Sequence, residues 1–483
     1  MYLGLDLGTS GLKGILISED QEVVGTAEQI YPVQNLSKGW SEQNPNDWLD
    51  ACEKVINLLA SRYSSQISDL KGIGISGHMH GATLLDDRDS VIRPCILWND
   101  TRAYLEAKNM DAFPSFREIS GNIVFPGFTA PKVAWVEKNE PENFRRISTI
   151  LLPKDYVRLW LTGDLISEMS DAAGTSWLDL HNRCWSKKLL SLSRLDLGQM
   201  PRLIEGSEVG GALRAKLRRR WNIRRDVVVA GGGGDNASAA CGSGVIFEGQ
   251  GFISLGTSGV LLVARDNCVP SPETAIHTFC HAIPNRWYQM GVILAATDAL
   301  NWLSKISNKT VLELSSQLAM DPYGPSDLKF APYLAGERTP HNDPFTRGAF
   351  IGLDISHSIS DLTQAVFEGV AFALKDSLLA LNKTGARVDK LFAMGGGIHS
   401  RFWLKTIATV LNIPLSVPKK GNLGAALGAS RLAIVAAESS DVSDVINAPM
   451  IEETIDPEPN LVDGYEDAYK VFSKIYPKIK VLK

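Results

Sequence analysis

Cysteine is scarce in this chain and is not arranged for metal binding or disulfide bonding. The 483 residues include six cysteines, and no two of them are spaced as CxxC. A zinc ribbon and a disulfide framework are therefore both disfavoured. We expect all six to be reduced, small core residues; they are Cys52, Cys95, Cys184, Cys241, Cys268 and Cys280.

Long apolar runs and an excess of one charge are absent too. The apolar stretch from Phe252 to Ala264 is interrupted by polar residues and glycine, well short of the ~18 apolar residues of a membrane helix. No basic segment leads an apolar run after Met1, so we expect no secretory signal. The 54 acidic and 49 basic residues leave a net charge of −5, which argues against a general nucleic-acid binder. The sequence predicts a soluble, cytoplasmic protein that binds neither membranes nor nucleic acid.

One basic cluster runs against that mild acidity. Its members are Arg214, Lys216, Arg218, Arg219, Arg220, Arg224 and Arg225. Such a run could contact phosphate groups, but no interleaved aromatic residues or nucleic-acid fold signature accompany it. We favour a solvated helix face followed by a loop.

Glycine, in contrast, is plentiful and clustered. The segment LGTSG at residues 7–11 recurs at residues 255–259, 248 positions further along. Each copy lies between two short apolar strands, which predicts a β-hairpin with a polar tip. These strands are Tyr2–Leu7, Leu12–Ile17, Gly251–Leu255 and Val260–Ala264. We therefore expect two related domains, residues 1–245 and 246–483, joined by a hinge near residues 240–250.

The rest of the chain alternates apolar strands with helical patterns. Residues 48–60 form a helical pattern before a strand at residues 72–76, and residues 361–381 form a long amphipathic pattern. This alternation predicts α/β architecture in both halves.

The chemistry of the two hairpin tips suits phosphate. Glycines allow close approach of the backbone, and Thr and Ser add hydroxyl groups. Two facing tips would hold a polyphosphate between the two domains. The predicted nucleotide contacts are Gly8, Thr9, Ser10 and Lys13 in the first copy and Gly256, Thr257 and Ser258 in the second.

The two copies differ at the position just before the repeat. Asp6 precedes the first tip, where Ser254 stands in the second. A single carboxylate beside a phosphate site favours Mg²⁺, held directly or through water. The alternative is that Asp6 caps the turn.

Two further glycine clusters follow apolar strands. Residues 227–230 lead into Gly231–Gly234 and then Asp235, which stands where a helix should begin and where the helix dipole favours a carboxylate. Residues 391–394 lead into Gly395, Gly396 and Gly397, followed by a helical pattern at residues 401–411. The second turn either accepts a planar base such as adenine or allows a close strand-to-helix crossing.

The choice of reaction depends on Asp235. No GxxxxGK[ST] motif occurs, so a Walker-type NTPase is disfavoured. Residues 232–237 satisfy the loose GxGxxA form of a dinucleotide-binding oxidoreductase, but Asp235 would repel the pyrophosphate. With MgATP as ligand, Asp235 instead receives the proton of an alcohol acceptor. Its orientation would matter more than its basicity, because in a loose transition state the hydroxyl loses its proton late.

The acceptor is expected beside the loop GHMHG at residues 77–81. His80 offers ring nitrogens to hydroxyl groups and Met79 offers an apolar wall. A metal held by His78 and His80 lacks a third ligand pattern, and a purely structural role for His80 is the other alternative. Trp98 and Asp100 also suit a sugar, unless Asp100 closes a turn with Arg102.

Taken together, these segments resemble the FGGY family of carbohydrate kinases, within the sugar kinase, Hsp70 and actin superfamily. The resemblance spans nearly the whole chain, and GHMHGATLL and GERTPHN are its most specific motifs. The segments include DLGTSGLK (6–13), GHMHGATLL (77–85), GFTAPKVAW (127–135), LPKDY (152–156), SDAAGTSW (170–177) and YLAGERTPHN (333–342).

The resemblance implies two α/β, actin-like (ribonuclease H-like) domains around a central cleft that binds ATP, Mg²⁺ and a sugar. It implies transfer of the γ-phosphoryl group to the C5 hydroxyl of D-xylulose. Asp235 would accept the proton and Asp6 would support the metal and phosphates. Met79, His80, Asp235 and Asn236 would contact the sugar, and the Gly395–Gly397 turn the adenosine.

Several alternatives stay open at this point. The chain could be a kinase of another pentulose or polyol, a non-catalytic actin-like ATPase, or a dehydrogenase. The family also allows a homodimer. Two departures from the family pattern are the fourth glycine, Gly231, and the basic segment Lys419–Asn422.

Overall fold

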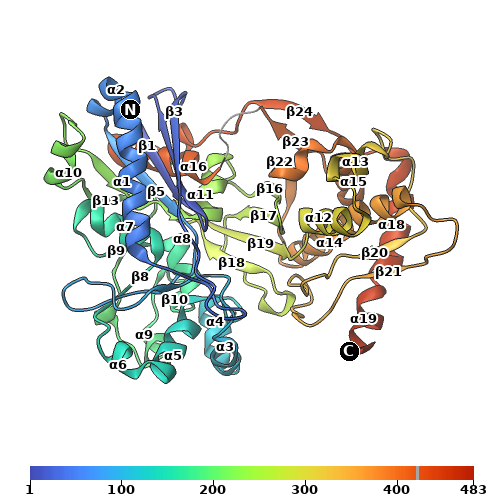
Figure 1. Cartoon of the computed structure of the whole chain (residues 1–483), viewed down its shortest axis with the longest axis horizontal. Helices are drawn as coiled ribbons and strands as arrows, with labels where there is room; N and C mark the ends of the chain where they lie inside the picture. Colours follow the sequence, from blue (N-terminus) through green and yellow to red (C-terminus); the bar gives the residue numbers. More distant parts are fainter. Residues whose placement is uncertain (420–423, 483) are drawn as a thin grey trace.

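The chain folds into two α/β bodies, each built on a seven-stranded sheet (Figure 1). The computed structural model describes residues 1–419 and 424–482. The first sheet has the order β13-β14-β5-β1-β2-β3, with β15 also paired to β5. Its strands are β1 (Tyr2–Leu7), β2 (Gly11–Ile17), β3 (Val23–Ile30), β5 (Gly72–Gly77), β13 (Val209–Ala212), β14 (Val228–Ala230) and β15 (Gly233–Gly234).

The second sheet has the order β18-β19-β17-β16-β22-β23-β24. Its strands are β16 (Gly249–Leu255), β17 (Gly259–Arg265), β18 (His277–Cys280), β19 (Trp287–Ile293), β22 (Val388–Met394), β23 (Leu415–Pro418) and β24 (Ile451–Ile455). Smaller two-stranded ladders pair β4 (Glu42–Gln43) with β7 (Cys95–Ile96), β6 (Thr83–Leu85) with β8 (Thr149–Leu151), β12 (Arg202–Ile204) with β9 (Ile166–Glu168), and β20 (Lys329–Ala331) with β21 (Ala349–Ile351).

Both predicted hairpins are present and occupy equivalent places. β1 pairs antiparallel with β2 and parallel with β5, while β16 pairs antiparallel with β17 and parallel with β22. The second hairpin strand continues antiparallel to β3 in one body and to β19 in the other. The sequence repeat is therefore also a repeat of sheet topology.

The predicted helices are also confirmed. The patterns at residues 48–60 and 361–381 lie inside α1 (Pro45–Arg62) and α14 (Ile359–Lys383), and α15 spans Arg401–Leu411. Local signals explain where they start. Asn44 caps α1 by accepting from the Asn46 amide, with Pro45 in the first turn, and Ser358 opens α14 with a capping box.

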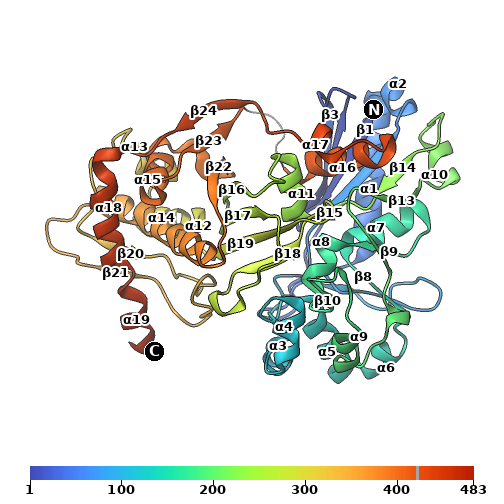
Figure 2. The same cartoon turned by 180° about the vertical axis from the view of Figure 1, so that it is seen from behind.

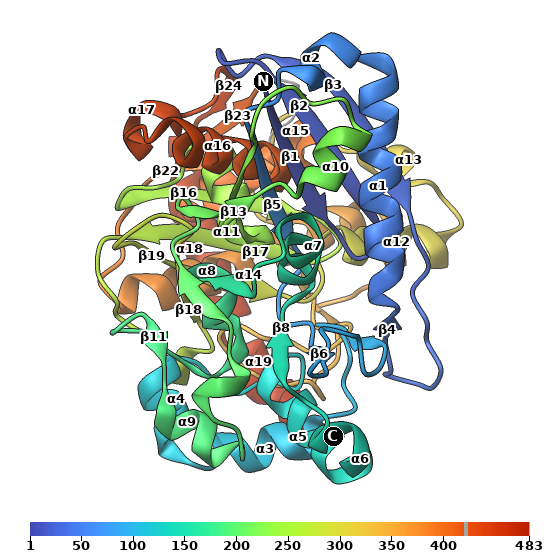
Figure 3. The same cartoon turned by 90° about the vertical axis from the view of Figure 1, so that its left-hand side faces the viewer.

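One helix from near the end of the chain packs against the first sheet. α16 (Ala425–Glu438) and α1 lie on opposite sides of β1 and β2 (Figures 2 and 3). Glycines in β1 and β5 permit this contact, because a Cβ at Gly4 or Gly74 would lie 1.9 or 1.8 Å from a carbonyl oxygen of α16. The domain boundary between residues 245 and 246 stays a prediction. The helix α16, which packs on the first sheet, comes from the part of the chain after that boundary.

The crossing of α16 with α11 (Asp235–Gly242) predicts a large stability effect at one glycine. A Cβ at Gly428 would lie 1.7 Å from the backbone oxygen of Ser238, so Gly428→Ala should lower the free energy of unfolding by about 1–3 kcal/mol or more. Gly464→Ala in α18 (Pro459–Phe472) is the matched control. Its Cβ would meet nothing closer than 3.6 Å, so it should be neutral or stabilise by about 1 kcal/mol. Thermal unfolding of both variants checks this, and equal Tm values would contradict it.

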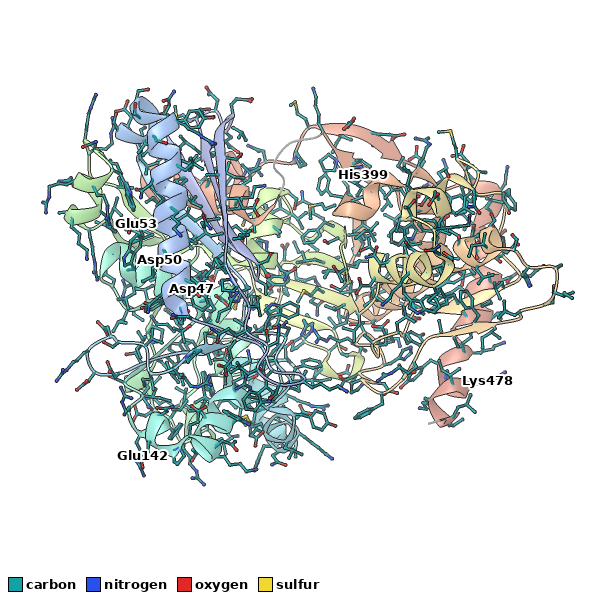
Figure 4. The ribbon with its side chains drawn as sticks, viewed as in Figure 1. Asp47, Asp50, Glu53, Glu142, His399 and Lys478 are labelled. Atoms are coloured by element: carbon teal, nitrogen blue, oxygen red, sulfur yellow. The ribbon has the colours of Figure 1, made fainter. Side chains whose placement is uncertain are left out.

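The basic cluster forms a short helix, α10 (Ala215–Arg220), and the loop after it, as predicted. Its charges are partly neutralised by neighbours, since Arg220 pairs with Glu53 at 2.8 Å and Arg218 pairs with Asp226. Glu53 belongs to a row of acidic side chains on α1 with Asp47 and Asp50 (Figure 4). This local ion pairing agrees with a solvated helix face.

Two other expectations from the sequence can be compared with the fold. All six cysteines are free, but only four are buried; Cys268 is half-buried and Cys184 is exposed, so the expectation of core positions is wrong for Cys184. Within residues 1–419 and 424–482, no helix is long and apolar enough to span a bilayer. The predicted basic segment at Lys420–Asn422 lies outside the described residues.

Candidate active site

Sheet topology brings Asp6, the Met79–His80 loop and Asp235 to one edge of the first sheet. β5 lies between β1 and β15 and is parallel to both, with Asp6 beside Ser76 and Gly234 beside Gly77. The carboxyl ends of the three strands therefore meet, and each is followed by one of the predicted site segments. Ligands of open α/β sheets bind at such an edge.

Asp235 is the first residue of α11, as predicted, but its electrostatics differ from the prediction. Burial, followed by the negative charge of Asp6, raises the pKa of Asp235 to about 6. The amide and the Nδ2 of Asn236 both donate to Oδ1, at 2.7 and 2.8 Å, and oppose this rise. The sequence predicted that the helix start would favour the carboxylate form, but burial has the larger effect on the pKa of Asp235. The result is a stronger base than an ordinary aspartate.

The hydrogen bonds of Asp235 leave one oxygen open. Both donors of Asn236 go to Oδ1, and Oδ2 receives no hydrogen bond from the described part of the chain. Asn236 thus orients the carboxylate while Oδ2 is free to accept a proton from a ligand.

Asp6 lies on β1 opposite Lys13 of β2. Its Oδ1 is buried without a hydrogen-bond partner among the described residues. Burial raises the pKa of Asp6, while Ser76 and Lys13 lower it. The turn is instead closed by the Gly8 amide, which donates to Gly11 O at 2.9 Å, so the capping alternative for Asp6 is not supported.

The unpaired oxygen of Asp6 suits a divalent cation whose other ligands are water and phosphate oxygens. Within residues 1–419 and 424–482 no group of three or more His, Cys, Asp or Glu side chains could hold a metal. Mg²⁺ commonly takes one or two carboxylates and completes its shell with water and phosphate oxygens. The residues present are compatible with that pattern.

The two hairpin tips turn several carbonyl groups toward the protein and hydroxyl groups outward. Thr9 O accepts from Gln43 Nε2, Gly256 O accepts from the amide and hydroxyl of Thr297, and Thr257 O accepts from the Ala296 amide. Ser10, Thr257 and Ser258 are exposed. Gly8 differs from the prediction in one respect, because its amide is already used to close the turn.

The second glycine turn shows the close packing that was one of its two predicted roles, and its adenosine role stays a prediction. A Cβ at Gly395 or Gly397 would lie 2.7 Å from an atom of Leu255, the residue before the second tip, so these two glycines allow close packing. Gly396 has no atom within 4 Å of a Cβ position and is exposed. Gly395 is exposed too, and Gly397 is buried, so the exposed backbone of this turn lies at Gly395 and Gly396.

His80 has a defined tautomer and a strained backbone. Its φ is 71°, a conformation uncommon outside glycine, and its backbone oxygen accepts from Thr129 Oγ1 and Lys132 Nζ, each at 3.0 Å. Burial and the Lys132 charge lower the pKa of His80 to about 3, so the ring is neutral. Nδ1 lies 2.7 Å from Gly174 O and must donate to it. Nε2 is then the acceptor that a sugar hydroxyl needs.

The two histidine rings of this loop pack against different aromatic neighbours. His78 packs edge-on against Trp48 at 5.7 Å, whereas the His80 ring stacks on Phe128 at 4.5 Å. Met79 is buried beside the turn, since a Cβ at Gly234 would lie 2.8 Å from Met79 Cγ. Met79 and His80 therefore form one side of the space near Asp235.

The predicted sugar contact at Asp100 is replaced by the turn alternative. Asp100 accepts from Arg102 Nε and Nη2 at 3.0 and 2.7 Å and from the Ser41 amide at 2.6 Å. Its oxygens are occupied, so its role is structural. Trp98 is 44% exposed and donates through Nε1 to Thr9 Oγ1 at 3.0 Å, which places it at the first hairpin tip.

A buried ionic network behind Asp235 was missed by sequence reasoning. Ser170 Oγ accepts from the Gly234 amide at 3.0 Å and donates to Glu168 at 2.8 Å. Lys154 pairs with Asp155 at 2.6 Å and with Glu168 at 3.2 Å, all fully buried. The signal was present in the motifs LPKDY and SDAAGTSW, whose charged residues lie among apolar ones.

The additional glycine is part of the same arrangement. Gly231 O accepts from Arg158 Nη1 at 2.5 Å, and a Cβ at Gly231 would lie 2.3 Å from Glu205 O. The network and the fourth glycine together hold the turn that leads to Asp235.

Comparisons with known proteins place this arrangement in a family. Residues 1–242 match the N-terminal domain of the FGGY family of carbohydrate kinases, and residues 251–437 match its C-terminal domain. The chain belongs to this family, and the predicted class of two actin-like α/β domains is confirmed. The chain is thus a sugar kinase, a phosphotransferase whose family uses ATP.

The most similar relatives agree on one kind of kinase. The chain is 42% identical to the xylulose kinase of Escherichia coli (strain K12), covering 99% of both chains. A crystal structure of a xyloylose kinase from Brucella ovis matches with a TM-score of 0.99 at 53% identity, covering 100% of both chains. The xylulose kinase of Rhodospirillum rubrum matches with a TM-score of 0.93 at 28% identity, over 100% of this chain and 99% of that one.

Proposed function

We propose that the chain transfers the γ-phosphoryl group of ATP to the C5 hydroxyl of D-xylulose, giving D-xylulose 5-phosphate and ADP. The full-length similarity to xylulose kinases supports the substrate. The observation that carries the chemistry is the meeting of Asp6 and Asp235 at one sheet edge, with the pKa of Asp235 raised to about 6.

The acceptor side of the reaction follows from the geometry of the first body. Asp235 Oδ2 would accept the C5 hydroxyl proton while Asn236 holds the carboxylate in place. His80 Nε2 would accept a hydrogen bond from a second hydroxyl, and Met79 would pack against the sugar carbons. Holding the hydroxyl at Asp235 in line with the phosphoryl group removes most of the entropic barrier.

The nucleotide side uses both bodies. The outward hydroxyl groups of Ser10, Thr257 and Ser258 would donate to the phosphates, with Thr9 and Lys13 beside them, and Gly396 would lie under the adenosine. Mg²⁺ would be held by Asp6, directly or through water, and would neutralise charge on the phosphates. Trp98, bonded to Thr9, would cover the first tip. The domain boundary at residue 245, a homodimer and a cytoplasmic location stay predictions.

The substrate is tested by ADP release with a panel of D-xylulose, D-ribulose, L-xylulose, L-ribulose and glycerol. We expect kcat/KM to be highest for D-xylulose by about tenfold or more, because a buried polar group left unpaired penalises the wrong epimer. Phosphorus-coupled NMR of the product should locate the phosphate on C5. A higher value for another acceptor would assign that substrate instead. ADP release that is independent of sugar would support a non-catalytic actin-like ATPase.

A further inference from the structure

A cluster of aromatic and cationic side chains joins the second body to the His80 side of the site. Phe128 stacks on His80 at 4.5 Å and lies 5.4 Å from Phe125. His277, the first residue of β18, lies 5.1 Å from Phe125 and 5.8 Å from Phe128. The Arg338 guanidinium lies 4.9 Å from the Phe125 ring. The contacts therefore run from His80 through Phe128 and Phe125 to His277 and Arg338 of the second body.

His277 has hydrogen-bonding groups that no described residue satisfies. The side chain is 2% exposed, and neither Nδ1 nor Nε2 has a partner. Burial and the charge of Arg338 lower the pKa of His277 well below its usual value, so the ring is neutral. A neutral imidazole offers one donor and one acceptor. Buried polar atoms are nearly always paired, so these two nitrogens need a partner from outside the described residues.

The guanidinium group of Arg338 also has hydrogen-bond donors that no described residue uses. Arg338 is half-buried, and its side chain forms no hydrogen bond or ion pair with residues 1–419 or 424–482. No ion pair is formed with the adjacent Glu337: its Oε1 accepts the amides of Leu294 and Arg338, and its buried Oε2 has no partner among the described residues. A guanidinium group only donates hydrogen bonds, so its natural partner is an oxygen that only accepts.

Hydrogen bonds of the neighbouring residues anchor His277 to the first body and Arg338 within the second. Thr278, next to His277, exchanges two hydrogen bonds with Asn122 at 2.9 and 2.8 Å. Thr339, next to Arg338, is bonded to Val292 in β19 and to Ala275 before β18. The backbone beside His277 is thus bonded to the first body, and Arg338 reaches the first body at the Phe125 ring.

We propose that His277 and Arg338 bind the ketone end of the sugar, His277 through the C1 hydroxyl and Arg338 through the C2 carbonyl oxygen. A hydroxyl both donates and accepts, which matches a neutral imidazole, and a carbonyl only accepts, which matches guanidinium. With the C5 hydroxyl at Asp235, the ketone end is the part of the chain that reaches the second body. This assignment rests on the proposed function and makes the two residues determinants of its specificity for a ketose.

Substrates that lack one group test each contact. 1-Deoxy-D-xylulose lacks the C1 hydroxyl, and xylitol lacks the C2 carbonyl. We expect the wild-type chain to prefer D-xylulose over each analogue by about tenfold or more in kcat/KM. His277→Phe keeps a ring but removes both nitrogens, and should reduce the preference over 1-deoxy-D-xylulose to less than about twofold. Arg338→Met should reduce the preference for D-xylulose over xylitol to less than about twofold. It should also raise KM for D-xylulose and leave KM for ATP unchanged.

Matched variants separate recognition from folding. His281→Phe changes another buried histidine just beyond β18, whose Nε2 bonds to Val245 O at 3.0 Å away from Phe125 and Phe128. It should leave both substrate preferences as in the wild-type chain, whereas Arg338→Lys should restore part of the preference over xylitol. Preferences that His277→Phe and Arg338→Met leave unchanged would overturn the inference with the kinase intact. A wild-type chain that phosphorylates no pentulose would overturn the proposed function as well.

Discussion

Replacing Asp235 with asparagine should lower kcat by about 10²–10⁴-fold, the usual contribution of a positioned general base. Asparagine keeps the shape of the side chain but cannot accept the C5 hydroxyl proton. Sugar and ATP should still bind, because the carboxylate acts mainly in the transition state. Calorimetric titration of both ligands and steady-state ADP release separate these effects. Asp444→Asn, in the first turn of the surface helix α17 (Val442–Val445), is the control for a carboxylate near a helix start.

The same variant should gain stability at neutral pH. The pKa of Asp235 is raised from 3.8 to about 6 on folding, so the folded chain holds this proton more tightly than the unfolded chain. The stabilisation is complete below pH 3.8 and is lost as the pH rises through about 6. Asp235→Asn removes that loss, so its Tm should exceed the wild-type Tm at pH 7 and equal it near pH 3.5. Unchanged kcat, or a Tm below wild type at pH 7, would contradict the assigned environment.

Replacing Asp6 with asparagine should lower kcat/KM by about 10–10³-fold, the order expected when a carboxylate beside a catalytic metal is lost. It should also move the pH dependence of the reaction. The loss is expected because the unpaired carboxylate oxygen that suits Mg²⁺ becomes a neutral amide. The shift is expected because the negative charge of Asp6 contributes to the raised pKa of Asp235. In the wild-type chain, kcat/KM should rise with pH through about 6 as Asp235 loses its proton. Without Asp6 this rise should occur at lower pH.

A pH profile of kcat/KM at saturating Mg²⁺ checks this prediction. A like charge near a carboxyl group raises its pKa, so its removal must act in the opposite direction. Lys13 also faces Asp6 and Ser76 lies beside it, and neither changes in this variant. If kcat/KM of Asp6→Asn still rises at about pH 6, as in the wild-type chain, the two carboxylates do not interact. A rise of kcat/KM at a pH above that of the wild-type chain would contradict the predicted direction of the shift.

Much of the fold and part of the site could be predicted because their signals are local. The LGTSG repeat, flanked by apolar strands, predicted both hairpins, and helical periodicity located α1, α14 and α15. Glycine before Asp235 predicted a strand, a turn and a helix start at that residue. These features follow from backbone geometry and from side-chain periodicity over a few residues.

Other parts of the candidate site depended on neighbours distant in the chain. The sequence offered Asp100 as a sugar contact, but Arg102 and Ser41 occupy its oxygens. It left two roles open for the second glycine turn, and only the structure shows that Leu255 packs against Gly395 and Gly397. His277 lies in no recognised motif, and Arg338 lies in GERTPHN without a predicted role. Their relation to His80 exists only after β18 packs against the first body.

By itself, then, the sequence determined two hairpin-bearing α/β halves and the family, and it proposed Asp6, Met79, His80 and Asp235 as site residues. Only the tertiary structure decided that α16 covers the first sheet, that Asp235 has a pKa of about 6, and which tautomer His80 adopts. The physical reason is the separation along the chain of the residues that interact. Turns and periodicity are set by residues next to one another, whereas burial, charge coupling and hydrogen-bond pairing are set by whatever the fold brings into contact.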